Sequence, residues 1–301
     1  MRAQRILVVS LAGVAILISA AVAQQEETPE VGPANGSLVI VGGAMRDPQI
    51  MERFLQLAGG PDAPIVVIPT AGGAESYDEY SSGLAGWKTA GATNLSVLHT
   101  KNRDVANSDD FVKTLREARG VWFNGGRQWH LADSYKDTKV HEELWNLLER
   151  GGVIGGSSAG ATIQGSYLAR GDTSGNTIMI GDHLEGLGFL KNTAIDQHLL
   201  RRNRHFDLLM IIEAHPELLG IGIDENTAIV VRGDNFDVMG QGYVAIYDAG
   251  SFLDDQPGGR GGPFYFLAPG DSFNLKTREA FRPTRSEEPL ERVKKREGAE
   301  Q

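Results

Sequence analysis

Short apolar runs alternate with longer segments of mixed polarity through the first half of the chain. Five runs are typical of buried strands: 37–41, 65–69, 95–98, 121–123 and 153–154. All but the run at 95–98 lead into a pair of glycines. Between the runs, apolar residues recur at helical spacing over 49–57, 77–89, 109–119 and 139–150.

Buried strands that alternate with helices indicate right-handed βαβ units, so we expect an α/β fold with a mainly parallel sheet and helices on both faces. Ligands of such sheets bind beyond the carboxyl ends of the strands, which is where the glycine pairs fall. A single glycine pair indicates no more than a tight turn. Four pairs that end four strands favour a shared cleft that the backbone approaches closely.

The pattern changes in the last third of the chain. A basic stretch over 198–212 is predicted to be helical. Apolar runs at 220–224, 227–231 and 243–247 follow, with turn residues between them. Closely spaced strands of this kind predict a C-terminal antiparallel β extension of the same domain.

The N-terminus has the order of a secretory signal peptide, which we place at 1–23. Two arginines precede an apolar run over 6–20, and Ala21-Val22-Ala23 resembles a cleavage site. A membrane anchor is the alternative, but a spanning helix needs about 20 apolar residues. We therefore expect a periplasmic or secreted protein with no membrane attachment after cleavage.

The remaining chain divides by composition. Residues 24–36 are polar and contain two prolines, so they are predicted to form a mobile leader. Residues 286–301 are crowded with charges and predict a solvated, disordered tail. Between them, 37–285 is long enough for one large α/β domain.

Charge and cysteine content exclude several classes of function. The formal net charge of −10 argues against nucleic acid as a partner, because phosphate binding needs a cationic surface. The sequence has no cysteine, which excludes disulfides, thiolate metal sites and a cysteine nucleophile. The glycine pairs are not followed by the lysine of a phosphate loop. We expect no metal and no cofactor.

The segment Gly156-Ser157-Ser158-Ala159-Gly160 fits the nucleophile-elbow pattern. Small residues flank the serine in such motifs because it occupies a strained turn between a strand and a helix. The run at 153–154 predicts the strand, and 161–169 predicts the helix. Ser158 is the central residue of the pattern, so it is the candidate nucleophile of a serine hydrolase.

A serine hydroxyl needs a base to accept its proton, and His198 is the histidine that stands out. It follows Asp196-Gln197 and precedes a run of arginines, a polar context that does not suit a core. Any one histidine is more often a surface or structural residue than a base. His205 and His215 are the alternatives.

Several motifs together resemble the cyanophycinase and dipeptidase E group of serine peptidases, peptidase family S51. They are the elbow around Ser158, the segment 123–128 before it, Asp196-Gln197-His198, and the segment 220–228. The resemblance spans roughly 37–248 in the same order. It implies a class I glutamine amidotransferase-like, flavodoxin-like fold and, by analogy, a homodimer.

By this resemblance Ser158 is the nucleophile and His198 the general base. The third member of the triad is expected to be an acid between them in sequence. Asp172 is the best positional match, and Asp182 and Glu185 are its rivals.

The resemblance also implies how the substrate is held. The expected oxyanion donors are the backbone N–H groups of Gly126 and Ala159. The expected substrate-binding side chains are Gln128, Gln197, Arg202 and Arg204. Two departures from the family pattern put a polymer substrate in doubt: Asp207 stands where a further basic residue is expected, and Arg127 precedes Gln128 in place of an acid or amide.

The leading hypothesis is an exported serine peptidase for acidic or β-aspartyl peptides, with cyanophycin (multi-L-arginyl-poly-L-aspartate), cleaved to β-Asp-Arg dipeptides, as substrate. The first alternative is a dipeptidase E-like enzyme for small aspartyl peptides. The second is a non-catalytic binding module on the same fold. An α/β-hydrolase esterase fits less well, because its histidine lies near the chain end.

Overall fold

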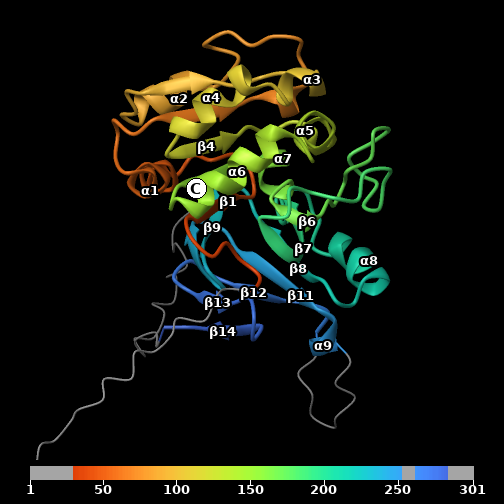
Figure 1. Ribbon diagram of the computed structural model, residues 1–301. Helices are drawn as coiled ribbons and strands as arrows, with labels where there is room; N and C mark the ends of the chain where they lie inside the picture. Colours follow the sequence, from red (N-terminus) through yellow and green to blue (C-terminus); the bar gives the residue numbers. More distant parts are fainter. Residues whose placement is uncertain (1–29, 253–261, 284–301) are drawn as a thin grey trace, which may run out of the picture.

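The computed structural model describes residues 30–252 and 262–283 of the chain. Within these residues the larger sheet has nine strands: β1 (Ser37–Val41), β2 (Ile65–Ile68), β3 (Leu95–Val97), β4 (Gly120–Phe123), β5 (Val153–Ser157), β9 (Thr227–Arg232), β10 (Asn235–Gly240), β13 (Ser272–Asn274) and β14 (Glu279–Phe281). Their spatial order is β14-β13-β10-β9-β1-β5-β4-β2-β3 (Figure 1).

The two ends of this sheet differ in strand direction. Strands β1, β5, β4, β2 and β3 pair in parallel, as the alternating apolar runs predict. On the other side of β1, every pair from β9 to β14 is antiparallel. The α/β class and the antiparallel C-terminal extension are therefore confirmed.

A second sheet was not predicted. Its strands, in the described residues, are β6 (Gly165–Tyr167), β7 (Leu190–Gln197), β8 (Leu219–Ile223), β11 (Val244–Asp248) and β12 (Tyr265–Leu267). Their order is β12-β11-β8-β7-β6, with β6, β7 and β8 parallel. This sheet brings the segments after β7 and β8 to the same edge, which becomes important at the site.

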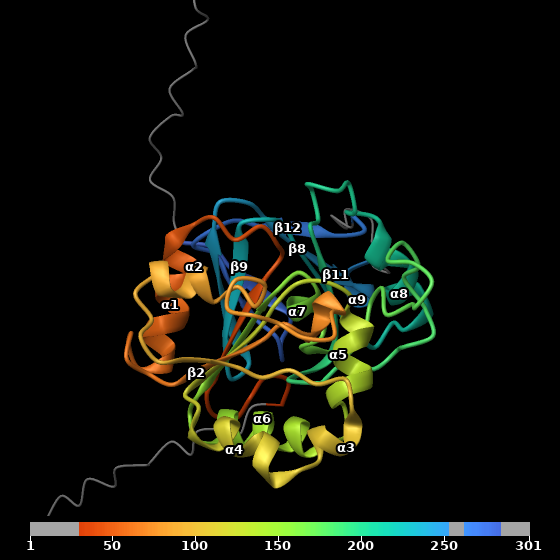
Figure 2. The same cartoon turned by 90° about the horizontal axis from the view of Figure 1, so that it is seen from above.

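The helices are α1 (Pro48–Ala58), α2 (Leu84–Thr89), α3 (Arg103–Ala106), α4 (Asp109–Glu117), α5 (Gln128–Tyr135), α6 (Lys139–Glu149), α7 (Ala159–Thr162), α8 (Asp207–Ala214) and α9 (Ala249–Phe252), with a short 3₁₀ turn η1 (Thr70–Gly72). Residues of α1 and α2 share one core cluster with Val39 and Val41, whereas α4 and α6 share another with Leu38 and Ile40. Because alternate residues of a strand point to opposite faces, helices cover both faces of the parallel sheet (Figure 2).

Three predicted helices are wrong in extent. The helix predicted over 77–89 begins only at Leu84. The helix predicted over 161–169 ends at Thr162, and the chain enters β6 because Gly165 accepts a hydrogen bond from Gly188 of the neighbouring segment. In the basic stretch predicted to be helical over 198–212, residues 198–206 form turns, and helix α8 starts only at Asp207.

The predicted signal peptide 1–23, the first part of the leader (24–29) and the tail 286–301 lie outside the described residues. Residues 30–36, expected to be mobile, are instead held in place. The N–H groups of Glu30, Val31 and Gly32 donate to the carboxylate of Asp234 in the turn between β9 and β10. Within the described ranges, no helix has the length and apolar character to span a bilayer.

Candidate active site

Ser158 lies in a sharp turn between the end of β5 and the start of α7. Its backbone has φ 57° and ψ −113°, a conformation that non-glycine residues rarely adopt. The flanking glycines are needed for packing: a Cβ on Gly156 would lie 2.3 Å from the carbonyl oxygen of Gly160, and one on Gly160 would lie 2.2 Å from that of Phe123. The turn is the strained elbow that the sequence predicts, and strain of this kind clusters at functional sites.

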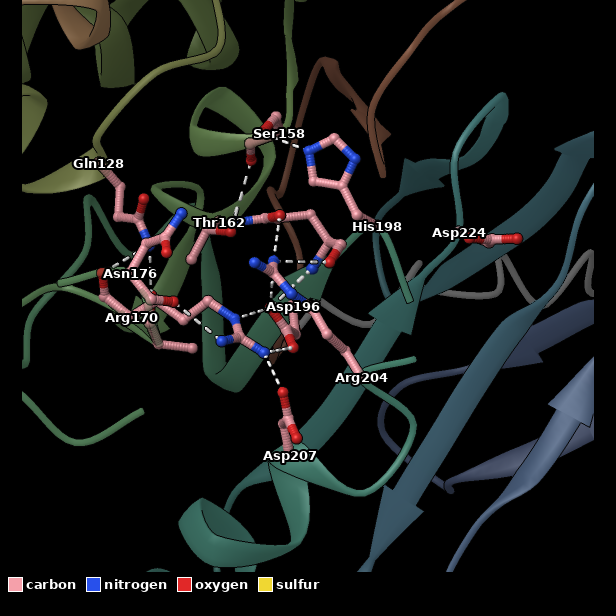
Figure 3. Close-up of polar contacts among 12 residues, drawn as sticks. Gln128, Ser158, Thr162, Arg170, Asn176, Asp196, His198, Arg204, Asp207 and Asp224 are labelled. Atoms are coloured by element: carbon pink, nitrogen blue, oxygen red, sulfur yellow. Dashed lines mark hydrogen bonds and ion pairs between the residues drawn. The ribbon is translucent and has the colours of Figure 1, made fainter. Parts of the chain in front are cut away.

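His198 follows the last residue of β7 and faces the elbow. Its Nε2 lies 2.9 Å from Oγ of Ser158, and Figure 3 shows the two side chains pointing toward each other. The backbone of Gly43 approaches the imidazole ring closely, since a Cβ on Gly43 would lie 2.3 Å from Cε1 of His198. The structure therefore places together the two residues that the sequence analysis paired.

The end of β1 fixes the backbone of this site through three consecutive carbonyl oxygens. Val41 accepts from the N–H of Ser158 at 3.0 Å, Gly42 from His198 at 2.8 Å, and Gly43 from Asn226 at 2.8 Å. The three donors all have positive φ, at 57°, 55° and 55°. The segment 41–43 thus fixes the positions of three strained turns relative to one another, although these turns follow three different strands.

The carboxylate on the far side of His198 belongs to Glu225, not to Asp172. Oε1 of Glu225 lies 2.7 Å from Nδ1 of His198. The prediction of Asp172 is wrong, because its Oδ1 accepts from the N–H groups of Ser174 and Gly175 and the residue caps its own loop.

The two rivals of Asp172 are also engaged elsewhere. Hydrogen bonds from Thr173 and His183 lower the pKa of Asp182 to about 2, and Glu185 pairs with Lys136 at 2.7 Å. Sequence order misled the prediction, because the acid was expected between the serine and the histidine. The available signal was that Glu225 follows an apolar run, as the residues after the glycine-ended strands do.

The environment of His198 favours a neutral imidazole. Burial lowers the pKa of His198, the hydrogen bond that the ring donates to Glu225 opposes that effect, and the positive charge of Arg202 lowers the pKa further. A neutral ring with its Nδ1–H donated to Glu225 presents a free lone pair at Nε2 toward Ser158. This is the protonation state that a general base requires.

The residues predicted to supply the oxyanion donors, Ala159 and Gly126, lie on the elbow itself and on a turn close to Ser158. A Cβ on Gly125 would lie 3.7 Å from Ser158 Oγ, so the Gly125-Gly126 turn passes close to the nucleophile. Gly126 has φ 147°, and a Cβ there would lie 2.1 Å from the carbonyl oxygen of Ala71. Ala159 opens helix α7 directly after the nucleophile. The turn therefore requires glycine where the resemblance expected a backbone donor.

The predicted substrate-binding residues fall into two groups. Gln128, Gln197 and Arg204 are buried, and their polar atoms bind the protein itself. Nε2 of Gln128 donates to the carbonyl oxygens of Ala169 and Arg170, and Nη1 of Arg204 donates to Oε1 of Gln197. Arg202 is exposed beside His198. Of the four, Arg202 has the side chain most accessible to a ligand.

A buried ion pair beneath the site was not predicted. Arg170 is 1% exposed and Asp196 is fully buried. Nε and Nη2 of Arg170 donate to the two carboxylate oxygens of Asp196 at 2.7 and 2.8 Å, and Nη2 also reaches Asp207 at 2.5 Å (Figure 3). Asp196 lies two residues before His198, so this pair anchors the strand that delivers the histidine.

The described residues contain no group of three or more His, Cys, Asp or Glu side chains that could hold a metal ion. The polar groups that converge are a hydroxyl, an imidazole and a carboxylate in hydrogen-bonded sequence. A serine, a histidine and an acid in this order define a serine-type hydrolase by geometry.

Comparison with known proteins assigns that hydrolase to a family. The family model described as Peptidase family S51 matches residues 38–239. The chain belongs to peptidase family S51 and is a serine-type peptidase of the cyanophycinase and peptidase E kind.

The curated relatives that match are cyanophycinases. The chain is 33% identical to the cyanophycinase of Geminocystis herdmanii over 262 residues, which cover 81% of this chain and 95% of that protein. It is 33% identical to the cyanophycinase of Nostoc sp. over 223 residues, 70% of this chain and 73% of that protein.

Two solved structures share the fold. A peptidase from an acI-B1 actinobacterium superposes with a TM-score of 0.58 at 25% identity, covering 80% of this chain and 97% of that one. A protein from Listeria monocytogenes described as a peptidase E superposes with a TM-score of 0.52 at 18% identity, covering 69% of this chain and 99% of that one. The second likeness supports the fold alone.

Proposed function

We propose that the protein hydrolyses cyanophycin, multi-L-arginyl-poly-L-aspartate, to β-aspartyl-arginine dipeptides. The observation that carries the proposal is the hydrogen-bonded chain from Ser158 through His198 to Glu225. It supplies a serine mechanism, and relatives named cyanophycinase that match most of the chain supply the substrate class.

In the first half of the reaction, Oγ of Ser158 attacks the carbonyl carbon of the scissile aspartyl bond. Its proton passes to Nε2 of His198, and Glu225 stabilises the imidazolium that forms. The negative oxygen of the tetrahedral intermediate faces the N–H groups of Ala159 and Gly126. The C–N bond then breaks, and His198 donates the proton to the leaving amine.

In the second half, water attacks the acyl-serine ester. His198, neutral again, accepts a proton from the water, and the carbonyl carbon forms a second tetrahedral intermediate. Collapse of this intermediate breaks the bond to Oγ of Ser158, which regains the proton from Nε2. The enzyme returns to its starting state with no cofactor consumed.

We also propose that the protein acts outside the cytoplasm, in the periplasm or after secretion. The support is the order of arginines, apolar run and small residues over 1–23. Detection of a mature protein that begins at Gln24 in a periplasmic or culture fraction tests this. Recovery from the cytoplasm of a protein that still begins at Met1 would contradict this proposal.

The test of the activity is the release of β-aspartyl-arginine from purified cyanophycin, with Ser158→Ala as the matched control. We expect release by the wild type and a loss of roughly 10⁴-fold or more in the variant. The variant keeps the elbow geometry and differs by one oxygen. If the protein cleaves small aspartyl peptides but not cyanophycin, the polymer hypothesis is wrong and the dipeptidase E-like alternative is favoured.

Turnover by Ser158→Ala at the wild-type rate would overturn the serine mechanism. Absence of hydrolysis on any peptide by a folded wild-type protein would favour the binding-module reading.

A further inference from the structure

A pocket of about 390 Å³ adjoins the triad on the side of Glu225. Its volume lies within the range of about 300–1,000 Å³ that is common for ligand sites. Its lining includes Arg46, Arg201, Asp224, Glu225, Asn226 and Gln241. None of the oxyanion or substrate-binding residues expected from the sequence is in this set.

Three consecutive residues build the pocket and connect it to the triad. Oδ1 of Asp224 accepts from the backbone N–H groups of Leu200 and Arg201, both at 3.0 Å. Glu225 holds His198. Oδ1 of Asn226 accepts from the N–H of Arg46 at 2.8 Å and also from that of Asp47. The residues on either side of the triad acid therefore each fix the backbone of one arginine.

The charges in the pocket are unevenly compensated. One oxygen of Asp224 binds two backbone donors, and one oxygen of Glu225 binds the imidazole. In contrast, the guanidinium groups of Arg46 and Arg201 form no hydrogen bond or ion pair with any residue of 30–252 and 262–283. Both residues are exposed. In a protein of net charge −10, this pocket therefore presents two guanidinium groups that carry no carboxylate partner among the described residues.

The chemistry of a guanidinium favours a carboxylate, which it can bind with two parallel hydrogen bonds. We infer that this pocket is a subsite for a free carboxylate of a substrate unit adjacent to the cleaved one, held by Arg46 and Arg201. The inference rests on the proposed function, because each unit of multi-L-arginyl-poly-L-aspartate keeps one free carboxylate and one guanidinium. Asp224 and Glu225 also line this pocket, and their carboxylates suit the guanidinium.

The kinetic test compares the double variant Arg46→Gln/Arg201→Gln with Arg232→Gln. Arg232 is an exposed arginine at the end of β9 away from the triad, so the control removes one charge without touching the pocket. On cyanophycin we expect the double variant to raise KM at least tenfold, with a much smaller change in kcat. We expect the control to match the wild type. Equal KM values for the double variant and the control would overturn the subsite.

A binding test separates failure of the subsite from failure of the proposed function. If the wild type does not cleave cyanophycin, tetra-L-aspartate serves as the probe, and its binding is measured by calorimetry at low and high salt. Salt-sensitive binding that is lost in the double variant and kept in Arg232→Gln upholds the carboxylate subsite while the cyanophycin proposal falls. Binding that is the same in all three proteins, or absent from all, overturns the subsite.

Discussion

Nδ1 of His198 lies 2.7 Å from Oε1 of Glu225, although 27 positions separate the two residues in sequence. The pairing of β7 with β8 explains this proximity. These strands run in parallel, with Gln197 opposite Ile223, so the residues that follow them emerge at the same sheet edge. The acid of the triad is thus supplied by the second sheet, after the histidine in sequence.

Glu225→Gln should lower kcat by about 10²–10⁴-fold, because the amide no longer stabilises the imidazolium or enforces the tautomer with a proton on Nδ1. The matched variant is Asp172→Asn, which we expect to stay within a few-fold of the wild type. Both are measured by release of β-aspartyl-arginine, with circular dichroism to verify folding. A large loss in Asp172→Asn together with a normal rate in Glu225→Gln would restore Asp172 as the third member.

The rate should depend on the protonation of His198 in a definite direction. Burial lowers the pKa of His198 below its ordinary value of 6.5. The value of kcat/KM, which reports the free enzyme, should therefore rise with pH to a plateau, with a midpoint below pH 6.5.

Arg202→Gln tests the cause of that shift. Removal of a nearby positive charge favours the imidazolium, so the pKa of His198 should rise and the rising limb should move to higher pH. Arg232→Gln, far from the ring, should leave the midpoint in place. A midpoint that stays fixed in Arg202→Gln, or moves to lower pH, contradicts this account of the electrostatics.

The parts of the site that the sequence predicted depend on local backbone chemistry. Gly156 and Gly160 are required on both sides of Ser158 because any Cβ would collide with a carbonyl oxygen, and such a requirement is visible in five residues. The apolar runs similarly predicted β1, β2, β4 and the start of β5. Both signals depend on residues that are close together in the chain, so they can be recognised in a single sequence.

The parts that the sequence missed depend on contacts between distant segments. Glu225 reaches His198 only because β7 and β8 pair, and no pattern within either strand encodes that pairing. The basic stretch after His198 is predicted to be helical, but Asp224 binds the N–H groups of Leu200 and Arg201 and stabilises a turn there instead. In both places, contacts between segments that are distant in sequence determine the structure, and the local sequence pattern does not reveal it.

Gly43→Ala should reduce kcat by at least about 100-fold, because the added methyl would lie 2.3 Å from Cε1 of His198 and displace the ring. Gly59→Ala is the matched control. Gly59 also has positive φ, at 107° compared with 135° for Gly43, but an added Cβ there meets nothing within 4 Å. The control should therefore lose about 1–2 kcal/mol of stability from backbone strain and retain its activity. Equal activity of the two variants would show that Gly43 does not position the base.

Asp196→Asn should reduce the free energy of unfolding by about 3–5 kcal/mol, because the buried guanidinium of Arg170 loses its two-oxygen carboxylate partner and keeps only the partly exposed Asp207 as a charged partner. Asp207→Asn is the matched control: its side chain is 38% exposed, so we expect a loss of about 1 kcal/mol or less. Urea denaturation followed by tryptophan fluorescence measures both.

The apolar double variant Arg170→Met/Asp196→Leu distinguishes the cost of an unpaired buried charge from the value of the ion pair. If desolvation dominates, the double variant recovers most of the stability lost in Asp196→Asn, since neither charge remains buried. Its activity should still fall, because Asp196 precedes Gln197 and His198 and its carboxylate orients this segment through Arg170. A double variant less stable than Asp196→Asn would mean that the ion pair itself stabilises the strand that carries the histidine.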